Sequence, residues 1–169
     1  MTSDERYKAL ALELGRIVIG FAQIEGVFRH LAWNLIQSDQ FTGQVITAEL
    51  SFKSLLSLIS SLIKLKLKGQ EIEAEIDQRI KRANQLEELR NTYMHSRWGV
   101  YENIEETLRF KQVAKQKMGL RTTHMIKDHT AEVRQAADEM YQLYDEILET
   151  IRKLPADMNG MDRQRYTVS

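Results

Sequence analysis

The first 37 residues carry one unbroken helical pattern of apolar side chains, and this pattern restricts the fold more than any other feature. Apolar residues recur there in steps of three and four, the spacing of one face of an α-helix. The stripe consists of Leu10, Leu14, Ile17, Phe21, Ile24, Phe28, Leu31 and Leu35. Thr2 and Glu5 form a T-x-x-E capping box before it. The sequence therefore opens with a long helix that ends near Gln37, before S-D-Q-F-T-G.

Three further long helices are predicted from the same spacing and from their end signals. After a short helical or irregular piece, Ser51 is the expected N-cap of a helix that closes at Gly69. The third long helix runs over about 70–96. The fourth starts at a Thr130 cap and stops at Pro155, the single proline of the chain.

The residue composition changes between the third and fourth long helices. The segments T-L-R-F-K-Q-V-A and L-R-T-T-H-M-I-K are short, are enriched in β-branched residues and flank K-Q-K-M-G, which predicts a β-hairpin. The expected fold is all-α: a four-helix antiparallel bundle with this small β-hairpin insert between its third and fourth helices. One domain over 1–154 is expected, with the β-insert at 98–128 and a mobile polar tail at 155–169.

Composition excludes several classes of protein. The 169 residues contain 24 basic and 24 acidic side chains, so net charge does not predict a strongly basic nucleic-acid binder, although a local site needs only a few cations. The chain has no cysteine, which excludes disulfides and thiolate metal sites. No signal peptide or transmembrane span is recognisable, so we expect a cytoplasmic protein without membrane association. No cofactor and no metal site are expected.

Arg90, in the stretch LRNTYMHSRW, is a charge where the helical pattern requires an apolar residue. With Arg90 set to zero at about 100° per residue, Ile72 falls at about 0° and Leu86 at about −40°. Asn91 and His95 fall at about 100° and 140°, as neighbours on the flank of the stripe. The three polar residues therefore lie where the core meets a cleft.

Glu25 is a matching anomaly on the first helix, within about 20° of Leu14. Unpaired buried charges cost several kcal/mol, so a buried ion pair between Glu25 and Arg90 is expected. One interpretation is that this pair is only structural. A second comes from His95, which can exchange a proton near neutral pH beside a guanidinium that can hold a phosphate. Such a group can cleave RNA without a metal: a base deprotonates the ribose 2′-OH, and a cation stabilises the added charge on phosphorus.

The run Arg90-Asn91-Thr92-Tyr93-Met94-His95 resembles the R-x(4–6)-H signature of the HEPN superfamily in its R-N-x-x-x-H form. The resemblance spans about residues 4–154 and includes the helical setting and the H-S-R-W-G-V continuation. It implies Arg90 and His95 as the catalytic pair with Asn91 beside them. The supporting residues are Glu25, a looser match, with Tyr93, Ser96 and Trp98. The β-insert departs from the minimal bundle.

That resemblance also implies a metal-independent endoribonuclease of toxin or defence type. RNA would be the substrate. Two copies would form a homodimer with a composite site, with an antitoxin or a nucleotidyltransferase as a further partner. The alternative is a non-catalytic HEPN-like binding or scaffold module, in which Arg90 and Glu25 only hold the bundle together.

Other polar residues have two interpretations each. Lys111, Lys115, Lys117 and Arg121 could contact an RNA backbone, or form a solvated hairpin, which the sequence favours. His124 and His129 are a weak ligand pair and are expected to be exposed. His30 is expected to be structural. Trp98 could stack on a base or pack at the helix end.

Overall fold

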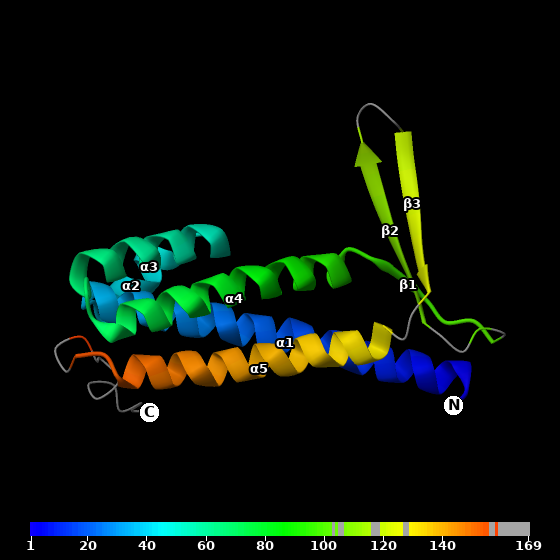
Figure 1. The fold of residues 1–169 in the computed structure, drawn as a ribbon, viewed down its shortest axis with the longest axis horizontal. Helices are drawn as coiled ribbons and strands as arrows, with labels where there is room; N and C mark the ends of the chain where they lie inside the picture. Colours follow the sequence, from blue (N-terminus) through cyan, green and yellow to red (C-terminus); the bar gives the residue numbers. More distant parts are fainter. Residues whose placement is uncertain (103, 105–106, 116–118, 127–128, 156–157, 159–169) are drawn as a thin grey trace. The chain divides into compact units, whose positions relative to one another are not determined.

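The computed structural model describes residues 1–102, 104, 107–115, 119–126, 129–155 and 158, and within 111–126 it describes the backbone alone. This part of the chain is mostly helical, with one small antiparallel sheet (Figure 1). The helices are α1 (Ser3–Ile36), α2 (Gln40–Thr47), α3 (Phe52–Lys66), α4 (Glu71–Met94) and α5 (His129–Arg152). The strands are β1 (Arg97–Gly99), β2 (Leu108–Lys115) and β3 (Gly119–Ile126).

The four long helices were predicted correctly, and the short piece after the first helix is α2. Their ends differ by up to three residues from the prediction: α4 ends at Met94 rather than Ser96, and α5 begins at His129 rather than at the Thr130 cap and ends at Arg152, before Pro155. Such differences are usual where the first and last turns lack helical partners. None of the described helices is both long and apolar enough to cross a membrane.

The chain divides into two compact units. The first unit comprises Met1–Phe21 and Leu86–Met140, and the second comprises Ala22–Gln85 and Tyr141–Ser169. The first unit holds the sheet, in the order β1-β2-β3 with both pairs antiparallel. Lys115 pairs with Gly119, so β2 and β3 form the predicted hairpin. The centre of its K-Q-K-M-G turn lies outside the described residues, as does the expected mobile tail except Pro155 and Met158.

Arg6 fixes the chain that follows β1 in the first unit. Its guanidinium donates to the backbone carbonyl oxygens of Ile104 and Tyr101, the latter at 2.9 Å. The side chain is 9% exposed. A buried guanidinium needs acceptors, and here loop carbonyls supply them. This contact connects the N-terminal turns of α1 to the chain that leads from β1 towards β2.

In the second unit, Trp33 organises the packing between α1 and α2. Its indole Nε1 donates to the Thr47 hydroxyl at 3.0 Å, and that hydroxyl donates to the Gly43 carbonyl oxygen at 2.8 Å. A Cβ on Gly43 would lie 2.5 Å from the Trp33 ring, so only glycine fits there. Ser51 caps α3 as predicted, because its Oγ accepts from the Ser54 N–H at 3.2 Å.

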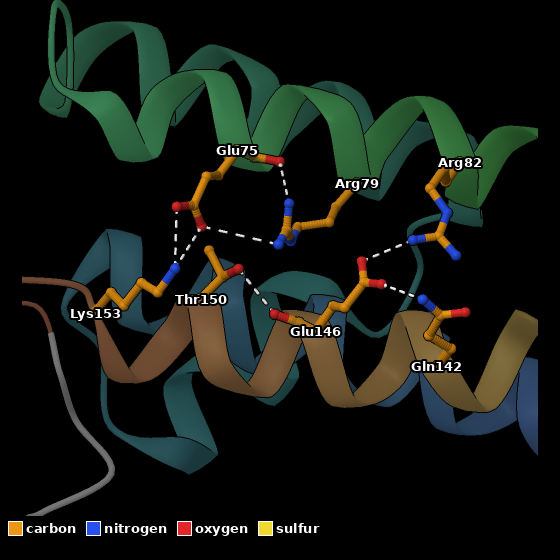
Figure 2. A network of polar contacts seen from close by, with 7 residues as sticks. All are labelled: Glu75, Arg79, Arg82, Gln142, Glu146, Thr150 and Lys153. Atoms are coloured by element: carbon orange, nitrogen blue, oxygen red, sulfur yellow. Dashed lines mark hydrogen bonds and ion pairs between the residues drawn. The ribbon is translucent and has the colours of Figure 1, made fainter.

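A polar network connects α4 and α5 within the second unit (Figure 2). Arg82 pairs with Glu146 at 2.7 Å, and Lys153 pairs with Glu75 at 3.0 Å. Gln142 donates to Glu146 at 2.9 Å. All these groups are partly exposed to solvent, so each pair contributes only modestly to stability.

Candidate active site at the end of helix α4

The residues of the R-N-x-x-x-H run lie in the last turns of α4, in the first unit. Tyr93 is buried, Arg90 and Asn91 are half-buried, and His95 is exposed. The His95 backbone N–H donates to the Asn91 carbonyl oxygen at 3.1 Å, so the helical geometry extends to His95. Asn91 and His95 are therefore one turn apart on the same side, as the sequence predicted.

Arg90 contacts an apolar ring and a polar neighbour at the same time. Its Cζ lies 5.4 Å from the centroid of the Phe21 ring, within the range of a cation–π contact. Its Nη1 donates to Asn91 Oδ1 at 2.8 Å. Its Nε is buried and has no hydrogen-bond partner in the described part of the chain. The guanidinium is thus directed to the side of α4 that carries Asn91, with donor capacity left over.

The premise that Glu25 and Arg90 are buried charges is wrong, because both residues are only half-buried. Glu25 is about one-third exposed and pairs with Arg29, four residues on, at 2.6 Å. Glu25 and Arg90 belong to different units, so an ion pair between them stays a prediction. The helical projection placed the backbone positions well. It did not account for long side chains, whose charged heads reach the edge of an apolar face.

His95 is the one histidine of the first unit whose described side chain is open to solvent. Among the described residues, none forms a hydrogen bond with its ring. An exposed imidazole can accept and release protons without a conformational change, which suits a general acid or base. The expectation that His95 lies off the apolar stripe is confirmed.

Trp98 packs against the helix end. Its Nε1 donates to the Tyr93 carbonyl oxygen at 3.1 Å, and the two ring centroids are 6.0 Å apart. The Arg109 guanidinium lies over the Tyr93 ring, with its Cζ 5.6 Å from the ring centroid. Burial raises the pKa of the Tyr93 hydroxyl. Of the two interpretations of Trp98, the structure favours helix-end packing over base stacking.

Ser96 also acts on the backbone of this turn. Its Oγ donates to the Thr92 carbonyl oxygen at 2.6 Å. This bond satisfies one of the last carbonyl groups of α4, which have no helical partner. Ser96 and Trp98 therefore support the turn that carries His95.

His129 was predicted to be exposed, and that prediction is wrong. The side chain is completely buried at the start of α5, in edge-to-face contact with Trp98 at 5.8 Å between centroids. Its Nδ1 lies 3.1 Å from Glu132 Oε2, whereas Nε2 has no hydrogen-bond partner among the described residues. The signal was available, since His129 precedes buried Val133 by four residues and continues the α5 stripe.

Glu13 is the buried acid that the sequence analysis missed. It accepts from Arg134 at 2.9 Å and from Arg16 at 2.7 Å, and Arg16 also pairs with Asp138 at 2.5 Å. Burial acts to raise the pKa of Glu13, but the hydrogen bonds from Arg134 and Arg16 outweigh it and lower the pKa. Its position three residues after buried Leu10 was the available signal. This cluster holds α1 against α5 within the first unit.

The side chains of Lys111, Lys115, Lys117, Arg121 and His124 lie outside the described part of the chain. His30 is half-buried against Trp33, with ring centroids 4.7 Å apart, and burial lowers its pKa, which agrees with the structural role predicted.

No family model, curated protein or solved structure matches the chain.

Proposed function

We propose that this protein is a metal-independent endoribonuclease of HEPN type that cleaves single-stranded RNA. One observation carries this function: the exposed ring of His95 lies one turn from Asn91, whose Oδ1 holds the Arg90 guanidinium at 2.8 Å. A proton-transfer group, a cation and an orienting amide are thus gathered on one side of a helix end. Those are the groups that RNA cleavage by the adjacent hydroxyl requires.

In the proposed reaction, His95 removes the proton from a ribose 2′-OH. The 2′ oxygen bonds to the adjacent phosphorus, and the bond to the 5′ oxygen of the next nucleotide breaks. The products are a 2′,3′-cyclic phosphate and a free 5′ hydroxyl, which takes up a proton from an imidazolium or from water. Arg90 stabilises the charge on the phosphoryl oxygens, and Asn91 orients the guanidinium.

The biological setting extends the same proposal. The enzyme would act in the cytoplasm as a homodimer with a composite site, in a toxin or defence role. An antitoxin or a nucleotidyltransferase would restrain it. The long helices α1, α3, α4 and α5 would form the four-helix antiparallel bundle that carries the site, with the β-hairpin as an insert.

The direct test is incubation of purified protein with single-stranded RNA in EDTA. We expect cleavage by the native protein, cyclic-phosphate ends, and no cleavage of DNA of the same sequence, which lacks the nucleophile. Glu88→Ala, an exposed change on the same helix, is the matched control for His95→Ala. Cleavage that requires a divalent metal, or that His95→Ala leaves intact, would contradict this function.

A second function has one observation in its favour. Arg90 packs on the Phe21 ring inside the first unit, which is what a purely structural arginine in a binding or scaffold module would do. RNA binding without cleavage, at equal affinity in native protein and His95→Ala, would favour this non-catalytic HEPN-like module.

A further inference from the structure

The solvent face of α1 is apolar over residues 11–19, in the first unit. Leu12, Val18 and Ile19 are 65%, 49% and 57% exposed. On α4, by contrast, exposed positions are mostly polar, among them Glu71, Gln78, Lys81, Asn84, Gln85 and Glu88. Exposed apolar side chains are common singly, but several on one helix face mark an interaction surface.

These residues form one strip centred on Gly15. With Gly15 at zero and about 100° per residue, Ala11 and Val18 fall at about −40° and −60°. Ile19 and Leu12 fall at about 40° and 60° on the other side. A Cβ added to Gly15 would meet nothing within 4 Å, so open space lies above the centre of the strip. We call Ala11, Leu12, Gly15, Val18 and Ile19 together the Gly15 strip.

The strip is self-complementary under a two-fold rotation. If two copies of α1 pack antiparallel with the axis at Gly15, residues on one side of the strip meet residues on the same side of the other copy. Leu12 then lies opposite Ile19 of the partner subunit, and Ala11 lies opposite Val18 of the partner subunit. The two glycines meet at the axis, where the missing side chains allow the backbones to approach closely.

The charged side chains near the strip are compatible with this arrangement. Within the Gly15 strip no side chain is charged, and Lys8, the next exposed residue on this face, pairs with Asp4 of its own helix at 2.7 Å. Arg16 lies at the edge and is occupied by Glu13 and Asp138. In this antiparallel arrangement the dipoles of the two helices point in opposite directions. No like charges therefore meet near the axis.

We propose that the Gly15 strip of α1 binds a second copy of this chain through an antiparallel, two-fold α1–α1 contact. This strip specifies the surface of the homodimer proposed above, but it does not depend on RNA cleavage. The strip is about 12 Å long over residues 11–19, so the interface is at the small end of specific interfaces. We therefore expect a dimer with a Kd in about the micromolar range.

Gly15→Cys tests the symmetry axis, because the native chain has no cysteine. A two-fold axis at residue 15 brings the two Cα atoms close enough for a disulfide, which needs about 4.4–6.8 Å. We expect a covalent dimer under mild oxidation. Leu65→Cys, at a 78% exposed position on α3, is the matched control and should give little cross-linked product under the same conditions.

Sedimentation over about 1–100 μM provides the second test. Leu12→Glu with Ile19→Glu should raise the dimer Kd by about 100-fold or more, whereas Leu65→Glu should leave it unchanged. Circular dichroism should be the same for all three proteins, since the substituted side chains are exposed. A native protein that is monomeric throughout, or a dimer that persists in the double variant, would overturn this interface. If the native protein is a monomer that cleaves RNA, the dimer proposal fails and the ribonuclease proposal stands. If it is a dimer that does not cleave RNA, the ribonuclease proposal fails and the dimer proposal stands.

Discussion

His95 and His129 lie in the same unit and differ in almost every physical respect. His95 is exposed at the end of α4, and no described residue bonds to its ring. His129 is buried at the start of α5, with Trp98 against its ring and Glu132 at its Nδ1. Trp98 is half-buried and also packs on Tyr93, so an aromatic layer of these residues supports the turn that bears His95. The same residue type thus supplies an exposed ring at one position and a packed ring at the other.

The largest expected effect is on activity at the exposed histidine. His95→Ala should lower the rate of RNA cleavage by about 10²–10⁴-fold, because a general acid or base is lost. The free energy of unfolding should change by less than about 0.5 kcal/mol, because the side chain is exposed. Single-turnover cleavage and urea titration measure the two quantities. A large loss of stability would erase the contrast with His129.

The largest effect on stability is expected in this aromatic layer. Trp98→Ala should lower the free energy of unfolding by about 3 kcal/mol, because it removes a large ring and leaves the buried His129 ring without its neighbour. Cleavage per folded molecule should fall too, as the turn that carries His95 loses support. Thermal unfolding with activity assays well below the midpoint separates the two. Equal stability in Trp98→Ala would show that the layer supports nothing.

Glu13 and Glu25 repeat the contrast for carboxylates. Glu13→Gln should cost about 2 kcal/mol at pH 7, because Arg134 and Arg16 lose a buried anionic acceptor, whereas Glu25→Gln should cost under about 0.5 kcal/mol. The folded pKa of Glu13 is lowered from 4.5, so its contribution is present above the unfolded pKa. It is lost as the pH falls through the folded pKa. Urea titrations at pH 7 and pH 3 should therefore show the Glu13→Gln deficit shrinking in acid; a constant deficit would refute the linkage.

The smallest effect is expected from a ring replacement in the same aromatic layer. His129→Phe keeps an aromatic edge against Trp98 and removes the buried Nε2 that lacks a hydrogen bond, but loses the contact with Glu132. These changes oppose each other, so stability should change by less than about 1 kcal/mol. Cleavage should be retained. If instead His129→Phe abolished cleavage at unchanged stability, the two histidines would share the chemistry.

The sequence predicted backbone features well and side-chain environments less well. Local signals gave the long helices, the Ser51 cap and the β2–β3 pairing, because spacing and capping are properties of neighbouring residues. The polar run from Arg90 to His95 was located, and the exposure of His95 followed from its angle. The partner of Glu25 and the burial of His129 did not follow. Both depend on side-chain reach and on segments distant in sequence, which a single helical projection does not contain.

The two tryptophans of the chain lie in different units. Trp33 is buried in the second unit with its indole bonded to Thr47, and Trp98 belongs to the first unit with its indole bonded to the Tyr93 backbone. Each unit therefore carries one tryptophan in a defined polar contact. Fluorescence of Trp33→Phe and Trp98→Phe proteins would report the unfolding of each unit separately. Coincident or separate transitions would then show whether the protein melts as one cooperative body or as two.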